Sequence, residues 1–221
     1  MAGMFAYTSN FSADLNSWDV SNVTSMHGMF KYSNFNGDIS SWDISNVTST
    51  HGMFWDSPFN QDISSWDVSN VTVMSYMFKD TPFNQDISSW DISSVQEHVG
   101  GLSHMFDNTP FNQDISSWDV SNIQSFENMF GDGTQLSDQN QCAIHTSFSI
   151  NNLWPYDWSD ACFQPQTKEE LQTAVDLWVS DNASALATYG EINTWDVSLI
   201  TDMNHLFWNK TEFNSDISNW D

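Results

Sequence analysis

The chain has 221 residues, of which 29 are acidic and four are lysine, with no arginine, so its formal net charge is −25 at pH 7. A field of this sign repels nucleic-acid phosphates and anionic lipid headgroups, which excludes nucleic-acid binding. The 12 tryptophans and 16 phenylalanines exclude an acidic disordered chain, because such chains are poor in aromatic residues.

Residues 1–131 repeat a motif of 24 residues. The pair Trp-Asp begins at residues 18, 42, 66, 90 and 118, and a Met-Phe pair follows the same period. The one longer step holds an insertion in residues 94–104, where two adjacent glycines predict a loop. Self-similarity at a fixed period predicts repeats that stack on one another.

Each repeat contains two kinds of segment. In residues 23–30 the apolar side chains recur at i, i+3, i+6 and i+7, which matches one face of a short helix. Residues 38–44 are rich in β-forming side chains and predict a short strand. Neither element is stable alone. The predicted fold class is therefore an α/β solenoid with leucine-rich-repeat-like coils of about 24 residues, each a short strand plus a short helix, stacked into a parallel sheet.

One tryptophan and one phenylalanine per repeat are expected to face the core, where each meets its own copy in the next repeat. Trp55 and Trp208 instead follow a Met-Phe or Leu-Phe pair, so we expect them to be more exposed and to pack on glycans or a partner. The predicted repeat core comprises Trp18, Trp42, Trp66, Trp90 and Trp118, together with Phe30, Phe54, Phe78, Phe106 and Phe130.

Residues 132–167 contain both cysteines of the chain, Cys142 and Cys162. In an oxidising compartment they would form one disulfide that closes a loop of about 20 residues and stabilises it by roughly 3 kcal/mol. The alternative is two buried thiols in a reducing cytosol. This segment is interpreted as a C-terminal cap and disulfide-clasped connector.

Residues 168–221 begin with a predicted helix whose apolar side chains are Leu171, Val175, Leu177 and Trp178. One further repeat follows the helix. Since the terminal repeats of a solenoid need atypical caps, we expect a helical N-terminal cap and the first repeat of a second solenoid, with residues 1–131 forming the C-terminal part of a first one. Met1 aligns with Met26 inside a repeat, so we expect a segment of a longer tandem array.

The pattern MF…FNQDISSWDVSNVT…MF resembles the BspA-type leucine-rich surface-protein repeats, in the mycoplasma lipoprotein-associated repeat family of unknown function. The resemblance covers residues 1 to about 131 and resumes from residue 168. It implies a cell-surface protein built from repeats.

Aspartates recur once per repeat in two registers. One register contains Asp38, Asp62, Asp86 and Asp114. Stacked carboxylates are candidate ligands for calcium, although the motif lacks the density of dedicated calcium loops. The alternative is that each aspartate caps a turn by accepting local backbone amides. Histidines share registers only in pairs, which argues against a zinc site.

Six sequons are present, and they favour secretion and hence the disulfide. The candidate N-glycosylation sites are Asn10, Asn22, Asn46, Asn70, Asn182 and Asn209. We expect an extracellular or cell-surface location. No apolar run reaches the length of about 18 residues that would span a membrane, so we expect no direct membrane insertion.

Nothing in the sequence singles out a catalytic group, because every candidate carboxylate and serine recurs in the repeats. We expect no enzyme activity and no cofactor, with calcium as the one candidate metal. The leading hypothesis is a non-enzymatic extracellular structural or adhesion protein, part of a tandem array that forms a fibre or coat. Its expected partners are copies of itself, other surface proteins or glycans. The alternative is a secreted recognition module that binds a glycan or a basic protein on its repeat face.

Overall fold

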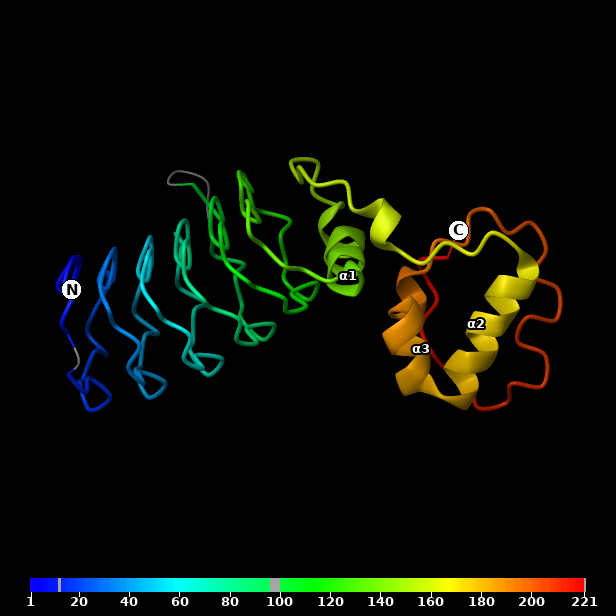
Figure 1. Cartoon of the computed structure of the whole chain (residues 1–221), viewed down its shortest axis with the longest axis horizontal. Coiled ribbons are helices and arrows are strands. Elements are labelled where there is room, and N and C mark those ends of the chain that lie inside the picture. The colour runs from blue at the N-terminus through cyan, green and yellow to red at the C-terminus, as the bar shows by residue number, and fades with distance from the viewer. Residues whose placement is uncertain (12, 96–99, 221) are drawn as a thin grey trace. The chain divides into compact units, whose positions relative to one another are not determined.

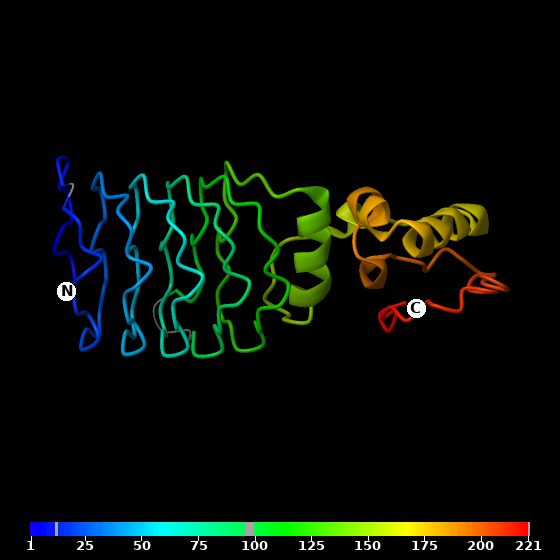
Figure 2. The same ribbon diagram turned by 90° about the horizontal axis from the view of Figure 1, so that it is seen from below.

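The computed structural model describes residues 1–11, 13–95 and 100–220, and the chain divides into two compact units. Unit 1 comprises residues 1–136 and 148–155, and unit 2 comprises residues 137–147 and 156–221. Unit 1 is a row of similar loops, coloured blue to green, that lie side by side in both views (Figures 1 and 2). The helices are α1 (Asp138–Phe148), α2 (Lys168–Ser180) and α3 (Asn182–Tyr189), with short 3₁₀ helices η2 (Ser159–Ala161) and η3 (Ile192–Thr194).

The predicted combination of strand and helix in each repeat is wrong. The described residues contain no strand, and those before residue 138 contain no helix. Residues 27–30 form a tight turn, and residues 38–44 are irregular apart from a turn at residues 40–41. In place of a parallel sheet there are two isolated parallel bridges, Ser25 to Ser49 and Ser49 to Val73. Residues 96–99 of the predicted loop lie outside the described residues.

Backbone torsions explain why the apolar pattern of residues 23–30 does not give a helix. Gly28 and Tyr32 have φ values of +57° and +55°, and the equivalent Gly52 and Asp56 have +56° and +54°. A right-handed helix needs a negative φ at every residue, so two left-handed residues four positions apart in each repeat interrupt it. The chain therefore forms consecutive tight turns that bring the same apolar side chains inward.

Backbone hydrogen bonds join each repeat to the next one. The N–H groups of Gly28 and Phe30 donate to the carbonyls of His51 and Met53, each at 2.8 Å, and equivalent bonds recur at the other junctions of unit 1. The intervening N–H groups donate within their own turn, as Met29 does to the residue three before it at 3.0 Å. In these turns the backbone N–H groups alternate between a bond within the repeat and a bond to the next repeat. Their hydrogen bonds are thus satisfied without a regular strand.

Two ladders of stacked phenylalanines fill the core of unit 1. The first contains Phe30, Phe54, Phe78, Phe106 and Phe130, with neighbouring ring centroids 5.6–5.9 Å apart. The second contains Phe35, Phe59, Phe83 and Phe111, spaced by 6.2–6.5 Å. Each stacked pair contributes about 0.5–1.5 kcal/mol beyond the burial of its area. The predicted phenylalanine core is confirmed, since none of its members is more than 7% exposed.

The tryptophan ladder adds a hydrogen bond to every junction. The indole Nε1 of Trp66 donates to the carbonyl of Ile39 in the preceding repeat at 3.1 Å. Equivalent bonds of 2.9–3.3 Å are made by Trp42, Trp90 and Trp118, and these four side chains are at most 4% exposed. Trp18 is the exception and is 36% exposed, so it is not part of the buried core that was predicted for it.

The last repeat of unit 1 is covered by residues 148–155. The side-chain Nδ2 of Asn151, a buried residue, donates to the carbonyls of Val120 and Ile123 at 2.8 Å each. Trp154 packs edge-on against Phe126, with ring centroids 5.2 Å apart. This short segment takes the place that a further repeat would occupy.

The predicted helical region that follows the connector is confirmed in unit 2. Thr167 caps α2 by accepting the N–H of Glu170 at 3.2 Å, and α3 ends at Gly190, whose φ is +71°. Helix α2 buries Leu171, Ala174, Val175 and Trp178 against the core of the unit, which is nearly the face predicted for it. No described helix is long and apolar enough to cross a membrane.

The replacement Trp66→Phe tests the junction hydrogen bonds. The ring stays apolar, but the buried carbonyl of Ile39 loses its indole donor, so we expect the free energy of unfolding to fall by about 1–3 kcal/mol. Trp208→Phe is the matched control, because Trp208 is 69% exposed and should give almost no change. Urea unfolding measures both, and equal losses would contradict the role assigned to the bond.

Candidate functional site

The repeats differ from one another mainly in the Met-Phe turn. The Asp-Ile-Ser-Ser-Trp-Asp segment is almost constant, whereas the positions occupied by residues 27, 28, 31 and 32 change from one repeat to the next. Constant positions maintain the stacking of the repeats, so a repeat protein obtains a specific surface from the positions that vary. The candidate site lies at these variable positions.

The variable positions of unit 1 bring together a set of rings that we call the aromatic strip. Each ring side chain is exposed or half-buried, and Tyr7 is 72% exposed. The strip consists of Tyr7, His27, Tyr32, His51, Trp55, Tyr76 and His104.

The rings of the aromatic strip stack along the row of repeats. Starting from Tyr7, the centroids of successive rings are 5.0 Å apart to Tyr32, 5.6 Å to Trp55, 5.0 Å to Tyr76 and 4.6 Å to His104. Such separations match offset stacking. The strip is thus a continuous aromatic surface that crosses five repeats.

Two stacked histidines contact the other rings of the aromatic strip. His27 and His51 stack at 4.6 Å with an interplanar angle of 10°, and His51 also lies 5.4 Å from Tyr76. Burial lowers the pKa of His51 below its usual value, and the neighbouring His27 and Lys31 lower it further. The pair that the sequence placed in one register is therefore in contact, and it forms part of the strip.

A lysine lies on the faces of two rings in the strip. The Nζ of Lys31 is 3.6 Å from the ring centroid of Trp55 and 5.1 Å from that of Tyr32. This is the geometry of a cation–π contact. Burial lowers the pKa of Lys31 below its usual value, because it disfavours the charged form.

An ionic network borders the strip at its other end. Asp107 pairs with Lys79, and its Oδ2 lies 2.9 Å from the Nδ1 of His104. Burial alone would raise the pKa of Asp107, but the hydrogen bonds from Lys79 and His104 hold it below the usual value. Asp80 accepts the indole N–H of Trp55 at 3.1 Å, which orients both side chains.

The aspartates predicted as calcium ligands accept backbone amides. The Oδ1 atoms of Asp38, Asp62, Asp86 and Asp114 each accept the N–H of the serine two residues later at 2.9 Å. In the first three these bonds also lower the carboxyl pKa. Within the ranges that the structure describes, no group of three or more His, Cys, Asp or Glu side chains is arranged to hold a metal ion. The geometry is that of turn caps.

All six sequon asparagines are exposed. The Nδ2 atoms of Asn46 and Asn70 each donate to a serine carbonyl of the preceding repeat at 2.8 Å. The sequon threonine Thr48 likewise donates its hydroxyl to the previous repeat at 3.0 Å. For Asn10 the sequon serine, Ser12, lies outside the described residues. Exposure makes the sites accessible, while the hydrogen bonds give two of them a role in stacking.

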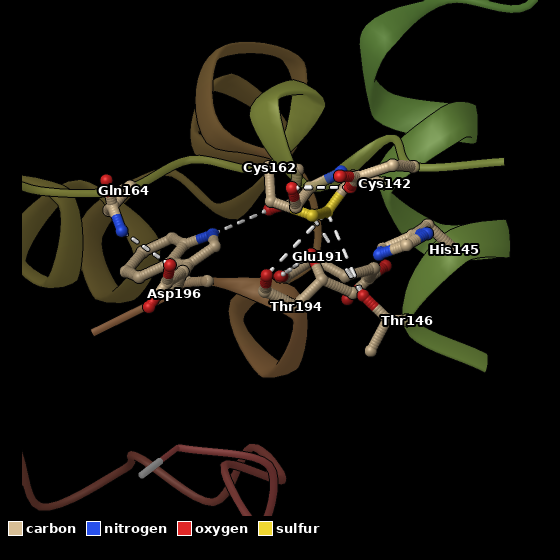
Figure 3. Close-up of a disulfide and its surroundings, with 12 residues drawn as sticks. Cys142, His145, Thr146, Cys162, Gln164, Glu191, Thr194 and Asp196 are labelled. Atoms are coloured by element: carbon tan, nitrogen blue, oxygen red, sulfur yellow. Dashed lines mark hydrogen bonds between the residues drawn. A yellow bond between two sulfur atoms is a disulfide. The ribbon is translucent and has the colours of Figure 1, made fainter. Parts of the chain in front are cut away.

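The predicted disulfide between Cys142 and Cys162 is confirmed, with an S–S distance of 2.06 Å. Cys142 lies on α1 and Cys162 follows η2, and both sulfurs lie 4.0 Å from the Oγ1 of Thr146 (Figure 3). The Sγ of Cys142 is 3.7 Å from the carbonyl oxygen of Thr194. The bond therefore ties α1 to the residue that follows η2, within unit 2.

A hollow of about 390 Å³ lies beside the disulfide in unit 2. Its wall includes Phe163, Leu186 and Tyr189 with the backbone of Gly190. The volume suits a small molecule.

Sequence reasoning found part of this surface and missed the rest. Trp208 is exposed as predicted. Trp55 is less exposed than Trp208 and is half-buried, because Lys31 and Tyr76 pack on it. The tyrosines Tyr7, Tyr32 and Tyr76 were not predicted to belong to this surface. Their signal was present, since bulky aromatic residues stand at positions that are otherwise Gly, Asp or Asn in a nearly constant repeat.

Replacing both cysteines by serine tests the clasp. We expect the variant Cys142→Ser/Cys162→Ser to lose about 3 kcal/mol of stability in unit 2, because the closed loop no longer restricts the unfolded chain. Denaturant unfolding measures the loss. Reduced wild-type protein should match the variant, and a reductant that changes neither protein would contradict the assignment.

Chelation tests the aspartate ladders. Because each carboxylate already accepts a local amide, we expect EDTA to leave the melting temperature unchanged. Scanning calorimetry of the chelated protein, before and after calcium is added back, is the measurement. A melting temperature that falls with EDTA and returns with calcium, but not with magnesium, would show that the ladders bind calcium.

Comparison with known proteins identifies a family. No curated protein and no solved structure matches the chain. The family described as "Mycoplasma protein of unknown function, DUF285" matches residues 1–81, 35–143 and 177–221. These matches cover both stretches that contain the repeat and well over half of the chain, so the protein belongs to this family of Mycoplasma proteins of unknown function.

Proposed function

We propose that the protein is a non-enzymatic extracellular structural or adhesion protein, in which the repeats serve as a scaffold and the aromatic strip serves as its contact surface. The observation that carries the proposal is the contrast between the buried positions and the outward positions of each repeat. The buried ladders hardly vary, whereas the outward positions of the Met-Phe turn gather seven rings on one face. Tyrosine and tryptophan are enriched where proteins bind partners.

Two features support an extracellular location. The disulfide between Cys142 and Cys162 is typical of oxidising compartments. All six sequon asparagines are exposed, as glycan attachment requires. The resemblance to BspA-type leucine-rich surface repeats adds to this support, because it implies a cell-surface setting.

A non-enzymatic role is supported by the chemistry of the recurring groups. The serines and aspartates that might serve as nucleophile or base bond to each other in turns, as Ser45 does to Asp43 at 2.6 Å. The same contact recurs between Ser69 and Asp67 at 2.6 Å. A catalytic group is normally unique in its environment.

Surface labelling of the source cells tests the location. We expect a membrane-impermeant amine reagent to label the protein on intact cells, and an endoglycosidase to lower its apparent mass. Labelling that appears only after the cells are lysed would contradict the proposal. A cytosolic protein labelled alongside it controls for leakage.

A second candidate is a secreted recognition module that acts as a discrete particle, and the concentration of rings on one unit favours it. Negative-stain imaging of native material separates the two candidates. Regular filaments or sheets are expected for the structural role, and separate particles for the module.

A further inference from the structure

Five left-handed residues form a row along the outside of unit 1. Their φ values lie between +53° and +61°, and the row consists of Tyr7, Tyr32, Asp56, Asp80 and Asn108. The backbone N–H of each of the first four donates to the carbonyl just before the next member, at 2.8–2.9 Å. Successive members therefore lie next to one another on adjacent repeats.

The tyrosines in this row occupy strained backbone positions. A left-handed conformation costs a bulky residue about 1–2 kcal/mol, whereas glycine adopts it freely. The chain uses glycine at the preceding left-handed position of the same turns, as at Gly28 and Gly52. A residue kept in an unfavourable conformation points to a role for its side chain, here one outside the core.

The side chains of the row share a preference for cations. The negative faces of the Tyr7 and Tyr32 rings attract positive charge, and the carboxylates of Asp56 and Asp80 do so more strongly. The whole chain adds to this preference, since its net charge is −25 and it contains no arginine. Such a field attracts basic proteins from a distance.

Lysines of the chain itself show how this surface receives a cation. Lys31 lies over the rings of Trp55 and Tyr32, at 3.6 and 5.1 Å. Lys79 pairs with Asp107, and its Nζ also lies 3.8 Å from the Oδ2 of Asp80. Lys31 is thus bound by rings of the strip, and Lys79 is bound by carboxylates in and beside the row.

We propose that this row and the rings beside it bind the lysine and arginine side chains of a basic segment of a partner protein. The inference rests on the proposed adhesion function and names the chemistry of the partner. Charge complementarity selects this occupant. Arginine suits the surface well, because its guanidinium stacks on aromatic faces and pairs with carboxylates.

Binding of a fluorescent oligoarginine peptide, followed by anisotropy at about 150 mM salt, tests the proposal. The variant Tyr32→Gly removes one ring without changing the charge, and glycine suits the left-handed position, so the fold should persist. We expect affinity to fall about five- to tenfold. The control Tyr156→Gly removes a half-buried tyrosine of unit 2 and should leave affinity unchanged.

Two charge variants distinguish binding at the row from a general attraction to the negative charge of the chain. Asp56→Asn and Asp67→Asn each remove one exposed carboxylate, the first in the row and the second at a turn cap. We expect the first to weaken binding about tenfold more than the second. Equal effects would show that the peptide follows net charge alone, which overturns the proposal.

Two further outcomes also count against it. If a neutral oligosaccharide binds, and Tyr32→Gly abolishes that binding while oligoarginine binding survives, the occupant is a glycan. If the wild-type protein does not bind oligoarginine, the inference fails, although surface labelling can still support adhesion.

If the protein is found only inside cells while the row binds the peptide, the adhesion function fails and the inference stands.

Discussion

The structure of unit 1 depends on how its backbone amides are shared. A helix uses all of them within one segment, and a sheet strand uses all of them with its neighbours. In the Met-Phe turns of unit 1, N–H groups alternate between a bond within the turn and a bond to the next repeat. Met29 bonds within its turn, and Phe30 bonds to the next repeat. This arrangement requires left-handed residues at regular intervals, and those residues direct one set of side chains inward and another outward. The buried phenylalanine ladders and the aromatic strip are the two results.

The sequence predicted the repeat period and its core, but it did not predict the local backbone conformation of each repeat. The period and the phenylalanine core follow from the spacing of the repeat, and the disulfide follows from two cysteines in a chain whose sequons favour secretion. The helix prediction for residues 23–30 failed because consecutive tight turns bury the same i, i+3 and i+4 positions that a helix does. Gly28 and Asp56 carried the missing signal, since glycine and aspartate are tolerant of positive φ. Tyr32 concealed it, because nothing in the propensity of tyrosine suggests a left-handed turn.

The polar residues of the motif explain how so acidic a chain stacks. The side-chain oxygens of Asn36 and Asn60 accept the backbone N–H of the equivalent asparagine in the next repeat, at 3.0 and 2.9 Å. The aspartates lie on the surface and accept amides of their own turn, where solvent and salt screen their mutual repulsion. The stack therefore gains neutral hydrogen bonds between repeats and keeps charge at its periphery. In the described part of the chain, no buried side-chain nitrogen or oxygen is left without a hydrogen-bond partner.

The longer step between the fourth and fifth Trp-Asp pairs, which begin at residues 90 and 118, has a consequence for how such arrays diversify. The backbone bond from Phe78 to Met105 and the indole bond from Trp118 to Ile87, both 3.1 Å, span the four additional residues without a break in the stack. Length added at this one place leaves every buried ladder in register. A lineage can therefore lengthen, shorten or exchange the segment there, and so change what a repeat displays, while the scaffold that carries it is inherited unaltered.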